Sequence, residues 1–81
     1  MGQQVERVLG QAFPGIQVVV DNVPGGRVNG HVVWDGFADH DNVERQQMIR
    51  AALNAGLGEE VTQVGLLLTY TPTELQAMMA A

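Results

Sequence analysis

The densest group of potential metal ligands in the sequence is the run Asp39-His40-Asp41. Carboxylate and imidazole groups bind divalent metal ions, and His31 could supply a further imidazole. Alternatively, the run is a polar loop in which Asp41 caps the following helix and His40 is solvated. Two carboxylates so close together on a short loop rarely converge on one ion, and no second acidic cluster supports the site. We therefore predict no metal site and no cofactor.

Other catalytic chemistry is also poorly represented. The chain has two histidines and nine acidic residues but no cysteine, which excludes thiolate catalysis and disulfides. It shows no phosphate-binding glycine loop and no Ser/His/Asp ordering of the kind that hydrolases use. Its 81 residues suffice for one domain, residues 1–81, with one core. These features predict a protein that binds a partner and is not an enzyme.

The charge balance argues against tight binding to nucleic acid. All four basic residues are arginines, and with nine acidic residues the net charge is -5. Phosphate-driven binding would require the arginines to gather on one face. The residues that could form such a basic patch are Arg27, Arg45 and Arg50. No two glycines have the Gly-x-x-Gly spacing with which KH domains clamp RNA, so we predict weak binding at physiological salt.

No segment predicts membrane insertion or export. The longest aliphatic stretch, Val64 to Leu68, is far shorter than the roughly 20 residues of a membrane span. The first residues lack the apolar segment of a signal peptide. We therefore predict a cytoplasmic protein with no membrane partner.

Three helices are predicted from apolar periodicity and capping signals. A stripe of apolar residues predicts a helix over 3–13, which Pro14-Gly15 ends. The run Asp41-Asn42-Val43-Glu44 is a capping box, and the helix after it extends to about residue 55. The run Thr71-Pro72-Thr73-Glu74 predicts a last helix. The apolar residues expected to be buried by that helix are Leu75, Met78 and Met79.

Between the helices, three segments rich in β-branched or aliphatic residues predict strands over 16–21, 28–35 and 61–69. The turn-forming residues at 22–26 predict a hairpin between the first two strands. The resulting order is α-β-β-α-β-α. We predict an α+β two-layer sandwich, in which a three-stranded mixed sheet carries its helices on one face.

Alternation along the strands predicts which side chains face the helices. Those expected on the helix side are Ile16, Val18, Val20, Val32, Trp34, Val64, Leu66 and Leu68. Those expected on the opposite, open face are Gln17, Val19, Asn29, His31, Val33, Gln63, Leu67 and Thr69. The predicted binding surface for a protein partner, or for a second copy of the chain, consists of Val19, His31, Val33, Gln63 and Leu67. The alternatives are scattered exposed aliphatics, a half-exposed histidine bonded to water, and cover by the last helix.

The second half of the sequence resembles the BolA family. The stretches that carry the resemblance are Asp35-Gly36-Phe37, Val43-Glu44-Arg45-Gln46-Gln47-Met48-Ile49, and Leu66 to Glu74 with its Thr69-Tyr70-Thr71 segment. The resemblance implies a class II KH-like fold. It also implies a small non-enzymatic partner of monothiol glutaredoxins in iron–sulfur handling, and some bacterial members are proposed to bind DNA.

The sequence departs from the family at the positions that would bind a cluster. The histidine that ligates iron in the family corresponds to Gln63, and the hairpin loop at 22–27 has no cysteine or histidine. An amide nitrogen does not replace imidazole on a cluster iron. The family's Arg-His-Arg run is reduced to Arg45-Gln46-Gln47. The resemblance is thus to a divergent BolA-like protein, and we predict that the isolated chain holds no cluster.

Overall fold

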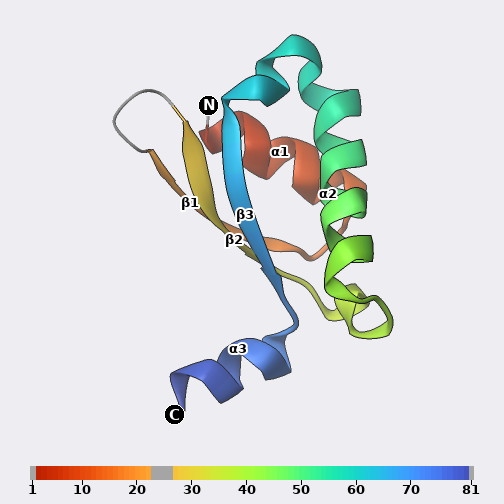
Figure 1. The fold of residues 1–81 in the computed structure, drawn as a ribbon, viewed down its shortest axis with the longest axis vertical. Coiled ribbons are helices and arrows are strands. Elements are labelled where there is room, and N and C mark those ends of the chain that lie inside the picture. The colour runs from red at the N-terminus through yellow and green to blue at the C-terminus, as the bar shows by residue number, and fades with distance from the viewer. Residues whose placement is uncertain (1, 23–26, 81) are drawn as a thin grey trace.

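A computed structural model describes residues 2–22 and 27–80 and confirms the predicted element order (Figure 1). The helices and strands are α1 (Gly2–Ala12), β1 (Gln17–Asn22), β2 (Val28–Val33), α2 (Asn42–Leu57), β3 (Val64–Tyr70) and α3 (Pro72–Met79). Two 3₁₀ helices, Asp35–Asp39 and Gly58–Gln63, flank α2. The residues of the predicted hairpin turn at 23–26 lie outside the described residues.

The sheet is mixed, as the sequence predicts. Its strand order is β1-β2-β3, with β1 antiparallel and β3 parallel to the central strand. Helices α1 and α2 pack on one face of this sheet and enclose the core. The buried residues of that core are Val5, Leu9, Val32, Phe37, Ile49, Leu53 and Leu67. The two-layer α+β sandwich is therefore confirmed.

The predicted facing of β3 is wrong for most of the strand. Leu67 is only 3% exposed and belongs to the core, and Thr69 is 6% exposed, whereas Leu66 is 60% and Leu68 44% exposed. The predicted strand start at 61–63 is also wrong, because these residues complete a 3₁₀ helix. Alternation alone could not decide the facing, because both faces of this strand are apolar.

A β-bulge explains why the facing of β3 is reversed. Val28 pairs with Val64, but Gly30 pairs with Leu67, so β3 advances one residue further than β2. Val64 and Leu67 therefore both face the helices although they are three positions apart. The side chain of Asn29 occupies the bulge, where its Oδ1 accepts a hydrogen bond from the Leu66 amide at 2.7 Å. A shift of one residue moves every later side chain to the other face.

The last helix is exposed, contrary to the prediction that it buries its apolar residues. Met78 is 56% and Met79 77% exposed, and Leu75 is half-buried. Figure 1 shows α3 leaving the end of β3 and extending away from α1 and α2. Because those two helices already cover the helix side of the sheet, α3 finds no free sheet surface there.

The bulge leads to a prediction about two adjacent leucines. Leu67→Ala should lower the free energy of unfolding by about 2–5 kcal/mol, because it leaves a cavity in the core. Leu66→Ala removes the same atoms from an exposed position and should cost less than about 1 kcal/mol. Urea unfolding of both variants measures the difference. Equal losses would contradict the bulged register of β3 against β2.

Candidate protein-binding surface

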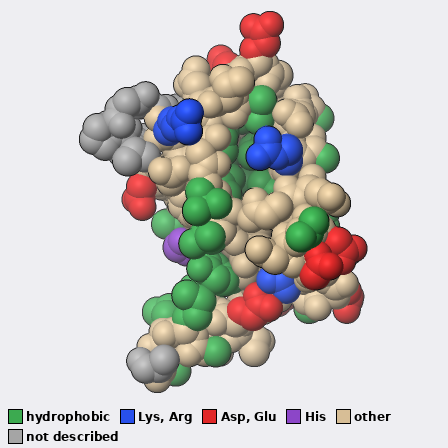
Figure 2. Space-filling model, in the orientation of Figure 1, with side chains coloured by type: hydrophobic (Ala, Val, Ile, Leu, Met, Phe, Trp, Pro, Cys, Tyr) green, Lys and Arg blue, Asp and Glu red, His purple; other side chains and the backbone are tan. Residues whose placement is uncertain are grey.

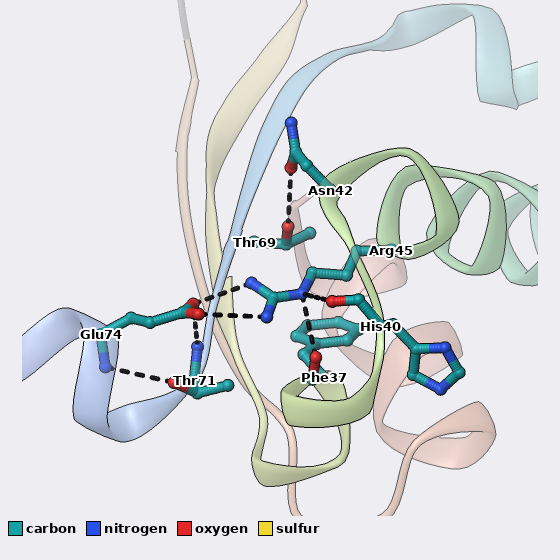
Figure 3. Close-up of polar contacts among 7 residues, drawn as sticks. All are labelled: Phe37, His40, Asn42, Arg45, Thr69, Thr71 and Glu74. Carbon is teal, nitrogen blue, oxygen red and sulfur yellow. Dashed lines mark hydrogen bonds and ion pairs between the residues drawn. The ribbon is translucent and has the colours of Figure 1, made fainter.

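Among the described residues, Arg45 forms the largest number of hydrogen bonds through its side chain (Figure 3). It lies in the first turns of α2 and is 8% exposed. Its Nε donates to the carbonyl oxygens of Phe37 at 3.0 Å and His40 at 2.9 Å. Its two terminal nitrogens donate to the two carboxylate oxygens of Glu74, at 2.8 and 3.1 Å. The guanidinium thus connects the Asp35–Asp39 3₁₀ helix, α2 and the start of α3.

Both predicted capping boxes are present beside Arg45. Asp41 accepts from the amide of Glu44 at 2.8 Å, and Glu44 accepts from the amide of Asp41 at 3.2 Å. At α3, Thr71 accepts from the amide of Glu74 at 3.1 Å, and Glu74 accepts from the amide of Thr71 at 2.9 Å. Glu74 therefore closes a cap and holds Arg45 at the same time.

The electrostatics of this cluster point to a structural ion pair. The hydrogen bonds from Arg45, and then the amide of Thr71, lower the pKa of Glu74 from 4.5 to about 2. The same pairing raises the pKa of Arg45. Arg45 is thus buried and paired with Glu74, whereas Arg27 and Arg50, the other two residues of the predicted basic patch, are exposed.

The run Asp39-His40-Asp41 connects the first 3₁₀ helix to α2, and its side chains make the contacts expected of a polar loop. Asp41 caps α2, and His40 Nδ1 lies 3.6 Å from a carboxylate oxygen of Glu44. Over residues 2–22 and 27–80, no group of three or more acidic, histidine or cysteine side chains is placed to hold a metal ion. Within the same residues, no helix is both long and apolar enough to cross a bilayer.

The open face of the sheet carries a row of exposed apolar side chains. Val19 of β1 lies opposite His31 of β2, and His31 lies opposite Leu68 of β3. Val19 is 48% exposed, similar to Leu68, and Leu66 is more exposed still. The ring of Tyr70 meets that of His31 edge-on, with 5.9 Å between their centroids. We call Val19, His31, Leu66, Leu68 and Tyr70 the open-face strip.

Figure 2 shows hydrophobic side chains gathered beside β3 and continuing onto α3. Met78 and Met79 supply the largest exposed apolar side chains of that helix. The strip and α3 thus contribute five large exposed apolar side chains, those of Val19, Leu66, Leu68, Met78 and Met79.

The structure retains part of the predicted binding surface and rearranges the rest. Val19 and His31 lie on the open face as predicted, while Leu67 belongs to the core. Val33 lies on the open face but is 5% exposed, and it lines a hollow with residues of α3 that include Leu75. Gln63 is exposed at the end of a 3₁₀ helix and is not part of β3.

Sequence reasoning missed Leu66, Leu68 and Tyr70 as surface residues. Gly65 was the available signal, because glycine inside a strand often marks a bulge. A Cβ at this position would collide with Asn29 Oδ1, which explains why the bulge requires glycine.

No protein-family model matches the chain, and no curated protein sequence matches it. The crystal structure of a Bol-like protein from Babesia bovis matches it with a TM-score of 0.66 and 22% sequence identity. The match covers 98% of this chain and 93% of the other. The chain has the BolA-like fold. The architecture implied by the sequence resemblance is thereby confirmed.

Acid should weaken the cluster that holds α3. With a pKa of about 2 in the folded chain and an ordinary value of 4.5, Glu74 takes up its proton at higher pH in the unfolded chain. Its stabilising contribution is therefore complete above pH 4.5, declines as the pH falls and is lost near pH 2. We expect the free energy of unfolding to fall less steeply over this range in Glu74→Gln than in the wild type.

Urea titrations at a series of pH values measure this slope. Glutamine still suits the third helical position of a capping box, so Glu74→Gln removes the charge and retains the cap. Glu59→Gln, an exposed change outside the cluster, should keep the wild-type slope. Identical slopes for the wild type and Glu74→Gln would contradict the role assigned to this carboxylate.

Proposed function

We propose that this chain is a cytoplasmic, non-enzymatic protein-binding domain whose partner docks on the open-face strip. The observation that carries the proposal is the exposure of Val19, Leu66 and Leu68 on the sheet face opposite α1 and α2. Scattered exposed aliphatics are normal on a protein surface, but a contiguous patch is typical of an interaction site.

The composition of the strip supports a protein partner. His31 and Tyr70 lie within it, and each combines an apolar ring with a group that can form hydrogen bonds. Aromatic and aliphatic side chains with few charges are characteristic of the centre of a protein–protein interface. A rigid sheet also holds these side chains in place before binding, which reduces the entropy lost on association.

A monothiol glutaredoxin is the partner that we propose, in the context of iron–sulfur handling. The BolA-like fold supports this choice, together with the sequence resemblance to that family. Gln63 replaces the family's histidine, so this chain would contribute no imidazole at that position to a shared cluster. We therefore propose that the contact depends on the open-face strip and forms without iron.

The alternative, a weak nucleic-acid-binding regulator, has less support. The ion pair with Glu74 satisfies the charge of Arg45, leaving Arg27 and Arg50 as the exposed members of the predicted patch. Two arginines on a chain of net charge -5 provide little phosphate neutralisation.

Substitutions on the strip should weaken binding while leaving the fold intact. Leu66→Asp and Leu68→Asp each place a charge in a contact that must be dry, and each should weaken binding of a purified monothiol glutaredoxin about ten-fold or more. Isothermal titration calorimetry measures the affinity under anaerobic, iron-free conditions. Val43→Asp is the matched control, because Val43 is 66% exposed but lies on α2.

Three outcomes would contradict the proposal or a part of it. Unchanged affinity in both strip variants would move the docking site elsewhere. Failure of the wild type to bind the glutaredoxin would remove this partner. Tight binding of duplex DNA or single-stranded RNA at physiological salt, lost in an Arg27→Ala and Arg50→Ala double variant, would instead favour the regulator.

A further inference from the structure

The two edges of the sheet are built differently. At the β3 edge, the side chain of Gln46 on α2 donates to the carbonyl of Leu67 at 2.8 Å. The bulge at Asn29 also interrupts the pairing of β3 with β2. In contrast, β1 pairs with β2 without interruption from Gln17 to Asn22, so the other edge is a regular strand.

The outer edge of β1 has few of the features that usually prevent pairing between edges. Among the described residues, no hydrogen bond outside the sheet ladder involves the backbone of residues 17–21. The strand Gln-Val-Val-Val-Asp-Asn contains no proline or lysine and carries one charge. Natural proteins protect exposed edges with charged residues, prolines, bulges or a covering segment. A regular, valine-rich edge is therefore suited to pairing with another strand.

We propose that a second copy of the chain pairs antiparallel along β1, joining the two three-stranded sheets into one. The pairing that we assign is centred on Val19, with Val19 opposite its own copy. Val18 then lies opposite Val20, and Gln17 lies opposite Asp21, on both sides of the two-fold axis. Each amide can donate to a carboxylate across the strands, and the two Asp21 side chains stay apart.

The sequence of β1 selects this register over its neighbours. Residues opposite each other in an antiparallel pair lie on the same face of the sheet. A two-fold axis perpendicular to the sheet therefore passes between two copies of the same residue. Moving this central residue by one position along β1 shifts the pairing of the two strands by two residues. Centring on Val20 would place Val19 opposite the carboxylate of Asp21. Centring on Val18 would leave Asp21 outside the pairing. The Val19 register alone matches valine with valine and glutamine with aspartate.

This edge shares only Val19 with the surface of the proposed function. Pairing along β1 leaves Leu66 and Leu68 of each copy exposed, because they lie on the strand at the other side of the sheet. It brings the two Val19 side chains together, so the two open-face strips become continuous. The edge contact therefore does not require the glutaredoxin proposal to hold.

Charge changes at Gln17 test the register. Sedimentation equilibrium of the full chain over a concentration series measures the dimer dissociation constant. Gln17→Glu creates two like-charged pairs with Asp21 and should weaken the dimer about ten-fold, whereas Gln17→Lys creates two opposite-charge pairs and should strengthen it by a similar factor. Adding Asp21→Lys to Gln17→Glu restores opposite charges and should restore dimerisation.

The matched control is Leu68→Asp, which alters the open face away from the edge and should leave the dimer intact. Residues Gln17 and Asp21 are exposed, so their substitution does not disturb the core, and circular dichroism checks that each variant is folded. A wild type that stays monomeric up to about 1 mM would overturn the proposal. A dimer that is lost in Leu68→Asp and unaffected by the Gln17 changes would also overturn it, and would place self-association on the open face.

Discussion

The bulge between β2 and β3 is the constraint on which the exposed apolar face of the sheet depends. Because Asn29 fills it and Gly65 leaves room for that side chain, β3 shifts by one residue against the central strand. The shift turns Leu67 into the core and turns Leu66 and Leu68 outward. Without the bulge, the same strand would bury the two leucines that now form part of the open-face strip. The surface is thus determined by a local backbone feature and not by the hydrophobicity of the strand.

The ion pair of Arg45 with Glu74 has a comparable role for α3. This helix packs little of its own apolar surface against the rest of the chain, so few dispersion contacts fix its direction. A bidentate guanidinium–carboxylate pair is directional, and here it joins a residue of the α3 cap to the first turns of α2. The orientation of α3 relative to α2 therefore depends on a polar contact more than on apolar packing.

Local signals predicted most of the fold. The capping residues Asp41 and Thr71 marked the starts of α2 and α3, and the apolar stripe of α1 marked its buried face. What failed was the facing of β3, since a strand that is apolar on both sides contains no alternation to interpret. The exposure of α3 was also unpredictable from its own residues, because it depends on how much sheet surface the other two helices have covered. Val19 and His31 were therefore placed on the correct face of the sheet, and the facing predicted for β3 was displaced by one residue.

The architecture itself explains why a chain of this size leaves apolar side chains exposed on one face of its sheet. A three-stranded sheet has two faces, and α1 and α2 together cover one of them. Covering the second face would require another helix layer, but the remaining helix is short and is held at the end of the sheet by Arg45. Burying apolar surface stabilises a protein by roughly 25 cal/mol for each Å² removed from water, and the exposed apolar residues on that face do not provide this stabilisation. A partner that covered Leu66 and Leu68 would recover this stabilisation, which is the physical reason for placing the proposed contact on this face of the sheet.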